Sequence, residues 1–219
     1  MFEKQGWHFL FLLALLILVG LTARGDVLAG SLWGISTQVW LWLAIVIPIA
    51  HQVIVGIIWR SELYHQWMTK AFGEQAFLVY KVIFTVLFVL RPIAILLLGV
   101  SNRGTLACPP GLMYMFGLAL LVPFGYTMYS VARYFGVDRA YGIDHFEPER
   151  YRQVTLVKKG MFKYSDNAMY KFGFLVLWSI AFLTLSKAAL LAAIFSHVYI
   201  WVHFYFTELP DMRTIYQER

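Results

Sequence analysis

The chain carries two long apolar segments near its C-terminal end, MYKFGFLVLWSIAFL (Met169–Leu183) and AALLAAIFSHVYIWVHFYF (Ala188–Phe206), joined by TLSK (Thr184–Lys187). Two apolar segments separated by a short polar turn predict a helical hairpin that crosses a membrane and returns to the face on which it began. Such a hairpin brings Asp166 and Asn167, which precede it, close to Glu208, which follows it. These polar residues are therefore the first candidates for a functional site.

The composition indicates that the whole chain is a membrane protein. Of its 219 residues, 60% are hydrophobic and only 14% are charged, and the mean hydropathy is +0.66. Soluble domains are about 45–50% apolar and about 25% charged. The long apolar segments predict an all-α integral membrane protein, in which each helix satisfies its own backbone hydrogen bonds. The single cysteine, Cys108, excludes an intrachain disulfide and a cysteine metal cluster.

The apolar segments predict a bundle of about six membrane helices with a C-terminal helix hairpin. They cover Trp7–Leu21, Val39–Trp59, Ala76–Val100, Leu112–Val131, Met169–Leu183 and Ala188–Phe206. The first could be a signal peptide, but no small-residue cleavage site follows it, and we interpret it as a retained helix. We expect one membrane domain over 1–219, with an extra N-terminal helix at 1–36, a helical core at 37–134, and a connector, hairpin and tail at 135–219.

The basic residues indicate the topology. The net charge is +6, and Lys and Arg are concentrated between Arg133 and Lys163, beside apolar segments. Basic juxtamembrane segments mark the cytoplasmic side and attract anionic lipid headgroups, so nucleic acid is not an expected partner. Alternation of six helices then places the connector and both chain ends in the cytoplasm, in a bacterial inner membrane or an endoplasmic reticulum-type membrane.

Several polar residues stand inside the apolar segments. Arg91 either extends to the far interface or pairs within the bundle, and its position nearer the far end of its segment favours the first interpretation. A helical projection puts His197, Trp201 and Glu208 on one face, a pattern more typical of packing than of a site. His203 points elsewhere and is interpreted as an interfacial residue.

The segment before the hairpin allows a structural and a functional interpretation. Ser165, Asp166 and Asn167 can each cap the next helix. A helix N-terminus at a membrane surface, with Gly160 just upstream, also suits an anionic group such as a carboxylate or phosphate. The sequence contains neither a convincing metal-ligand spacing nor a Ser-His-Asp pattern, so we expect no metal.

Several motifs resemble one family of membrane enzymes. GMFKYSDNAMY (Gly160–Tyr170) resembles the G-x-(Y/F)-x-(Y/F)-x-R-H-P-x-Y motif of the isoprenylcysteine carboxyl methyltransferase and phospholipid methyltransferase superfamily, and its DNAMY is similar to the D-N-P-M-Y of phosphatidylethanolamine N-methyltransferases. TELP (Thr207–Pro210) with Ile215-Tyr216 resembles that family's E-E-P and I-Y. Shorter similarities at Arg60–Glu62, Lys70–Gly73 and Phe116–Leu121 extend the resemblance from about Arg60 to Tyr216.

Three positions depart from the family pattern. Ala168 replaces the motif proline, VPFG (Val122–Gly125) replaces a G-L-G, and Leu209 replaces the second acid of E-E. The last two changes concern the cofactor geometry and the identity of the methyl acceptor.

The resemblance implies an enzyme that binds S-adenosyl-L-methionine and methylates a membrane-embedded acceptor, most simply the amine of phosphatidylethanolamine or its methylated derivatives. The cofactor-binding residues that it implies are Gly117, Gly125, Gly160, Tyr164, Asn167, Tyr170 and Glu208. The alternatives are a methyltransferase of the same superfamily that acts on a carboxylate, a thiol or another small hydrophobic acceptor, and a non-catalytic membrane subunit.

An amine acceptor imposes a further requirement, because its ammonium form has no lone pair and must lose a proton before methyl transfer. Candidates for the group that accepts this proton are Glu62, Asp144, His145, Asp166 and Glu208, and the sequence gives them no order. Glu208 could instead hold a cofactor hydroxyl or the cationic amine. Methyl transfer depends mainly on aligning two reactants, and such positioning can lower the barrier by about 7–11 kcal/mol.

Overall fold

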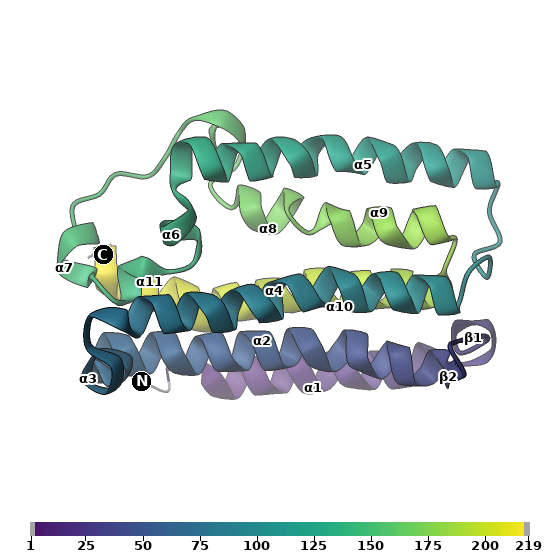
Figure 1. Cartoon of the computed structure of the whole chain (residues 1–219), viewed down its shortest axis with the longest axis horizontal. Coiled ribbons are helices and arrows are strands. Elements are labelled where there is room, and N and C mark those ends of the chain that lie inside the picture. Colours follow the sequence, from purple (N-terminus) through teal and green to yellow (C-terminus); the bar gives the residue numbers. More distant parts are fainter. Residues whose placement is uncertain (1–2, 217–219) are drawn as a thin grey trace.

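The structure is a computed structural model that describes residues 3–216, and it is a bundle of helices aligned along one axis (Figure 1). Within these residues, five helices are long and apolar enough to cross a membrane. They are α1 (Gln5–Thr22), α2 (Thr37–His65), α4 (Ala76–Ser101) with the short α3 (Trp67–Phe72) before it, α5 (Pro110–Ser130) with a π-helical end, and α10 (Lys187–His203) continuing into α11 (Leu209–Tyr216). A shorter apolar helix comprises α8 (Ala168–Phe172) and α9 (Leu175–Thr184). The prediction of a helical, multi-pass membrane protein is confirmed.

Both ends of the described chain lie at the same end of the bundle (Figure 1). This connector end also holds α3, α11 and the long connector, which includes α6 (Val137–Ala140), the single turn Ile143–His145 and α7 (Pro148–Tyr151). The opposite end, here called the turn end, holds strands β1 (Ser31–Leu32) and β2 (Ile35–Ser36), the loop after α4 and the turn between α9 and α10. Successive long helices therefore run in alternating directions, as repeated crossings of one membrane require.

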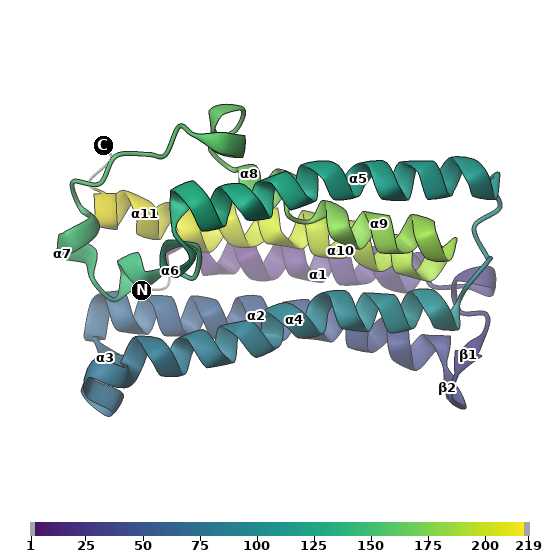
Figure 2. The ribbon, with the colours of Figure 1, turned by 45° about the horizontal axis from the view of Figure 1, so that its top comes forward.

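Helix α10 occupies the middle of the bundle, where it packs against α1, α2, α4 and α9 (Figures 1 and 2). Helix α9 lies between α10 and α5, and it packs against both. Four alanines of α10 are completely buried: Ala188, Ala189, Ala192 and Ala193. Small side chains let helix backbones approach closely, and in lipid such packing replaces the hydrophobic effect as a source of helix association.

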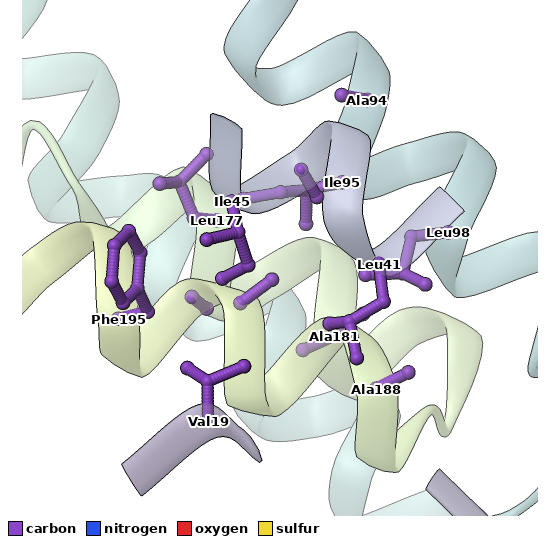
Figure 3. Packing of buried hydrophobic residues seen from close by; sticks show 14 of the residues in the cluster. Val19, Leu41, Ile45, Ala94, Ile95, Leu98, Leu177, Ala181, Ala188 and Phe195 are labelled. Atoms are coloured by element: carbon purple, nitrogen blue, oxygen red, sulfur yellow. The ribbon is translucent and has the colours of Figure 1, made fainter. Parts of the chain in front are cut away.

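The apolar core lies toward the turn end and draws on five helices (Figure 3). Leu41 and Ile45 of α2 meet Ile95 and Leu98 of α4 around the alanines of α10, and all four are completely buried. The side chain of Asn102 closes this end: its amide nitrogen donates to the carbonyls of Asp26 and Ala29 at 2.7 and 2.8 Å, and its oxygen accepts from the backbone nitrogen of Ala188 at 2.9 Å. The core and this hydrogen-bonded cap hold the helices in register at one end, so that side chains at the other can form a site.

The structure differs from the predicted helix ranges at two places, and it adds a short pair of strands. Helix α2 extends past Trp59 to His65, so Arg60 and Glu62 lie within a helix and not in a polar link. The first helix of the hairpin is divided at Gly173 into α8 and α9. The link before α2 contains the two-residue strands β1 and β2, which pair antiparallel. Such two-residue ladders leave almost no periodic signal in a sequence.

Candidate active site

A cavity of about 290 Å³ lies on the connector-end side of the core, between α2 and α4 on one side and α5, α6 and α8 on the other. Its volume is near the lower limit of typical ligand pockets, which is about 300 Å³. Aromatic rings contribute much of its wall: Trp59, Phe84, Phe88, Tyr141, Tyr170 and Phe174. The polar side chains in the wall are His51, Gln52, Arg91 and His203. An apolar ligand with a few polar groups would match this surface.

A second hollow of about 460 Å³ is formed by the connector. It is more polar, and its wall includes Asp138, Arg139, Tyr151 and Thr155. Val137 of α6 lines both this hollow and the aromatic cavity. The two spaces therefore adjoin at α6, one among the connector residues outside the bundle and the other among the membrane helices.

The two ends of the hairpin meet through Tyr170 and Glu208. The hydroxyl of Tyr170, on α8, donates a hydrogen bond to Oε2 of Glu208. The ring of Tyr170 packs against Trp201 and Phe204 with centroid distances of 5.9 and 5.4 Å. A hairpin that returns to its starting face predicts such a meeting, and the structure places a phenol, two further aromatic rings and a carboxylate together there.

A π-helical turn at Phe204–Glu208 sets the direction of Glu208. A π-turn inserts an extra residue into a helix, changes which side chains face inward and often occurs at functional sites. Helix α5 ends in a second π-turn, Val131–Phe135, and Val131 and Ala132 from this turn line the aromatic cavity. The cavity therefore lies at the π-turn that ends α5, and Glu208 lies at the π-turn that follows α10.

Buried ionic side chains fasten α11 to the rest of the connector end. Nε of Arg60 lies 3.1 Å from Oδ1 of Asp211, and Nη2 donates to the carbonyl oxygens of Phe206 and Thr207 at 3.3 and 3.1 Å. Those carbonyls belong to the π-turn, where regular helical pairing is interrupted, so Arg60 satisfies acceptors beside Glu208. Arg60 and Asp211 are 4% and 1% exposed, which shows that the pair is inside the fold.

His145 continues this network from the connector. Its Nδ1 lies 3.1 Å from Oδ1 of Asp144, and its Nε2 lies 3.7 Å from Oδ2 of Asp211, within ion-pair range but too long for a hydrogen bond. Burial alone would favour the neutral ring, but the carboxylates of Asp144 and Asp211 outweigh it and raise the pKa of His145 to about 9. Burial also opposes ionisation of Asp144, yet hydrogen bonds from His145 and Tyr216 lower its pKa below the ordinary value. His145 is therefore a charged link between two acids.

Gly142 allows the connector to reach this position. Its φ of +90° is a conformation that residues with a side chain rarely adopt, and a Cβ atom there would lie 2.5 Å from the ring of Trp59. The ring of His145 in turn stacks on Trp59 with a centroid distance of 4.3 Å. Trp59 also lines the aromatic cavity, so the connector supports one wall of it directly.

The structure places the predicted catalytic candidates in different environments. Glu62 is 2% exposed and accepts hydrogen bonds from the backbone nitrogens of Met68 and Thr69 at 2.8 and 3.1 Å, so it caps α3. Asp166 is exposed and pairs with Lys158 across the connector. Among the described residues, no ion pair or hydrogen bond joins Asp166 to Glu208. Of these acids, Glu208 is the one in contact with a residue of the aromatic cavity.

The predicted cofactor residues are also separated. Tyr164 is 73% exposed, and Asn167 precedes α8 without a side-chain cap hydrogen bond. Gly160 has a φ of +60°, and a Cβ there would lie 2.5 Å from Oγ of Ser130, so its conformation serves the packing of the connector on α5. Of these three residues none lines the aromatic cavity, whereas Tyr170 does.

The two glycines of α5 have different surroundings. Gly117 lies against Leu183, where a Cβ would come within 2.9 Å of Cγ, and its carbonyl accepts from Ser179 at 2.7 Å, so it permits close packing of α5 on α9. Gly117 lies thirteen positions before Ser130, the residue of α5 against which Gly160 packs, and this is about 20 Å along a helix. Gly117 is therefore far from the connector. Gly125 is exposed, and a Cβ there would have no atom of residues 3–216 within 4 Å beyond its own helix turn.

Two predictions about polar residues inside the helices are wrong. Arg91 does not extend to the far interface: it is 5% exposed, and its Nη2 lies 3.2 Å from Nδ1 of His51. His203 is not interfacial either, because it is 1% exposed and lines the aromatic cavity. The first prediction rested on the position of Arg91 along its segment and the second on a helical projection. Neither gives the position of the neighbouring helices. The one sequence signal for a buried polar site here was the presence of an arginine deep in an apolar segment, because such residues usually face the interior of a helix bundle.

The residues around Glu208 suit a cationic ligand group. The rings of Tyr170, Trp201 and Phe204 are mutual neighbours, with 5.7 Å between the centroids of the last two. Aromatic faces and a carboxylate are the groups that attract sulfonium and ammonium cations. In residues 3–216, Glu208 forms no ion pair with Lys, Arg or His. The donor set thus fits the sulfonium of S-adenosyl-L-methionine, and no group of three or more His, Cys, Asp or Glu in this range is arranged to hold a metal.

Comparison with known families identifies the part of the chain that forms this site. The model of the phospholipid methyltransferase family matches residues 112–219, which include Tyr170, Glu208 and the connector. Searches of curated proteins and of solved structures gave no match. Methyltransferases of this family generally use S-adenosyl-L-methionine. Through residues 112–219, this multi-pass membrane protein belongs to the phospholipid methyltransferase family and is a methyltransferase.

Proposed function

We propose that this methyltransferase transfers methyl groups from S-adenosyl-L-methionine to the amine of phosphatidylethanolamine or its methylated derivatives, at the connector end of the bundle. The observation that carries the proposal is the carboxylate of Glu208, which has no ion-pair partner in residues 3–216 and accepts a hydrogen bond from Tyr170, whose ring packs against two further aromatic rings. A carboxylate with no cation of its own attracts an ammonium group and repels a carboxylate acceptor. This charge pattern favours an amine over a prenylcysteine carboxylate.

The adjoining hollows support separate entry for the two reactants. The connector hollow is polar and suits a water-soluble cofactor, whereas the aromatic cavity lies among membrane helices and suits a lipid. Because Val137 lines both, reactants that enter from the two sides meet at α6, close to the wall that Tyr170 provides. Holding the reactants aligned is the main requirement of methyl transfer, and this arrangement meets it without a covalent enzyme intermediate.

The chain's own residues would hold and orient charge. When bound, S-adenosyl-L-methionine supplies an activated methyl group, and the electron pair of the broken carbon–sulfur bond stays with sulfur as the new carbon–nitrogen bond forms. Glu208 is positioned to stabilise the cationic amine and to accept its proton before attack. Tyr170 orients that carboxylate by its hydrogen bond, and the rings of Trp201 and Phe204 hold the ring of Tyr170 in place.

The other sequence candidates receive structural roles in this proposal. Glu62 holds α3, His145 links Asp144 to Asp211, and Asp166 pairs with Lys158. Each of these side chains already has partners that account for its position. We also propose that the connector end faces the cytoplasm, because the basic residues between Arg133 and Lys163 belong to it.

The proposal is tested by incubating the purified protein in phosphatidylethanolamine vesicles with methyl-labelled S-adenosyl-L-methionine and separating the lipids. Label in methylated phosphatidylethanolamine is expected. Tyr170→Phe should lower kcat/KM by at least about tenfold, the cost of one hydrogen bond to a charged group. Tyr205→Phe is the matched control, since that side chain is 50% exposed on the same turn of the chain as Glu208. Label found only in a base-labile ester, or in no lipid, would overturn the proposed acceptor.

A further inference from the structure

Within residues 3–216, Arg91 is a buried cation without an anionic partner. It lies about 22 Å along α4 from Ala76 and about 15 Å from Ser101, deep within the apolar part of the helix. Its side chain contacts Nδ1 of His51 and the ring of Phe174, whose centroid is 5.2 Å from Cζ. Its Nε is buried and has no hydrogen-bond partner, and among residues 3–216 no Asp or Glu forms an ion pair with it. An isolated charge in this environment is costly unless a ligand pairs with it.

Arg91 is one of several polar groups directed at the same cavity. His51, His203 and Arg91 all line it, and all three are at least nine-tenths buried. Nε2 of His51 and both ring nitrogens of His203 are buried without a hydrogen-bond partner in the described chain. Buried polar atoms almost always have partners, so three residues that lack them on one cavity wall indicate a group supplied from outside.

We propose that Arg91, supported by His51, binds an oxyanion of a ligand that enters the aromatic cavity. The guanidinium is the side chain best suited to a phosphodiester or a carboxylate, because its planar fork can donate two parallel hydrogen bonds. The oxyanion is either the phosphodiester of the lipid acceptor or the carboxylate of the cofactor. This assignment rests on the proposed function, and it adds a second ligand-binding group outside residues 112–219, the part that matches the family.

The spacing of the two charged groups favours the phosphodiester. Arg91 lies against Phe174, which follows Tyr170 by four residues, at the break between α8 and α9. Four residues in a helical conformation rise by about 6 Å. In phosphoethanolamine two carbon atoms separate the phosphate from the amine. A headgroup with its phosphate at Arg91 therefore reaches toward Tyr170 and Glu208 with its amine. One unpaired cation and one unpaired carboxylate near one cavity match a zwitterionic headgroup.

Binding measurements on Arg91→Met and Arg91→Lys test this assignment in the full-length protein. The probes are a short-chain phosphatidylethanolamine, an aminoethyl lipid that lacks the phosphate, S-adenosylhomocysteine and its decarboxylated analogue. If the phosphodiester is the oxyanion, Arg91→Met weakens only the first probe, by at least about tenfold, and Arg91→Lys weakens it less. If the carboxylate is the oxyanion, Arg91→Met weakens S-adenosylhomocysteine and leaves the decarboxylated analogue unchanged.

Lys81→Met is the matched control, because it removes another cation of α4 that is paired with Asp138 at 2.6 Å and does not line the cavity. A site that requires a ligand also predicts that Arg91→Met leaves the melting temperature of the ligand-free protein unchanged or higher, while reducing the ligand-induced rise. If Arg91→Met does not fold, Arg91→Lys carries the binding comparison.

The outcomes separate this inference from the proposed function. Affinities of both Arg91 variants within about twofold of the wild type for every probe, in a protein that still methylates phosphatidylethanolamine, overturn the oxyanion site alone. Binding that depends on Arg91, in a protein that transfers no methyl group to phosphatidylethanolamine, supports the oxyanion site and overturns only the proposed function.

Discussion

Replacing Glu208 with Gln tests the central feature of the site, a carboxylate that has no ion-pair partner in residues 3–216. The substitution keeps the size of the side chain and an oxygen that can accept the hydrogen bond of Tyr170, while it removes the negative charge. A hydrogen bond to a charged group contributes about 1.5–3 kcal/mol, which corresponds to roughly 10- to 150-fold in affinity or rate. We therefore expect Glu208→Gln to lower kcat/KM for phosphatidylethanolamine within that range.

The assay compares two cofactor forms that differ in charge. S-adenosyl-L-methionine carries a sulfonium cation, whereas S-adenosylhomocysteine contains a neutral thioether. If Glu208 faces the sulfonium, Glu208→Gln weakens the binding of the first and leaves the binding of the second unchanged. Equal losses for both forms indicate that Glu208 binds a cofactor hydroxyl. Losses for neither, with a reduced rate that recovers at high pH, indicate that it acts on the acceptor amine.

A double-mutant cycle with Tyr170→Phe measures the coupling energy between Tyr170 and Glu208. Residues in direct contact show coupling energies of about 0.5–3 kcal/mol, so the effect of Tyr170→Phe should shrink once Glu208 is Gln. Glu147→Gln is the matched control, because this glutamate lies on the connector, is 42% exposed and pairs with Arg150. Full activity of Glu208→Gln together with additive effects in the cycle would refute the proposed role of this carboxylate.

Two further predictions concern the connector. Gly142→Ala should lower the free energy of unfolding by about 1–3 kcal/mol, because its φ is +90° and the added Cβ would meet Trp59 at 2.5 Å. Thermal unfolding in detergent measures this loss. Gly104→Ala is the control, because its φ is +78° and the space around it is open, so it shows the effect of backbone strain without the clash. The raised pKa of His145, about 9, means that folding favours its protonated form, so its contribution to the free energy of unfolding is complete below pH 6.5 and is lost as the pH rises through 9, by at most about 3 kcal/mol. Melting temperatures at pH 6.5 and 9.5 measure this loss, and an equally steep decline in His145→Asn would contradict it.

Much of the candidate site was accessible from the sequence because two of its members lie at the ends of one hairpin. The polar turn at Thr184–Lys187 implies that Tyr170 and Glu208 lie at the same membrane face, and both residues also belong to motifs that resemble the family. Asp166, in the same motif, was expected beside them but lies on the exposed connector, paired with Lys158. A motif gives the order of its residues, whereas the conformation of the connector decides which of them face the helices.

Other members of the site depend on contacts between distant parts of the chain. Arg91 meets His51 from another helix, and Arg60 meets Asp211 across 151 positions of the sequence. Neither residue type nor periodicity reveals such a pair, because it depends on how far each helix is rotated and shifted against its neighbours. The interpretation of Arg91 as an interfacial residue failed for this reason.

The sequence alone determined the class of protein, the course of its helices and the two ends of the hairpin, because the thickness of a bilayer fixes the length of an apolar segment and a polar turn fixes its reversal. The tertiary structure alone decided which polar groups share the interior. Glu208 turns toward Tyr170 at a π-helical turn, and Arg91 turns into the aromatic cavity and not toward the membrane surface. Those directions depend on how each helix is rotated and shifted against its neighbours, which is set only when the helices pack together.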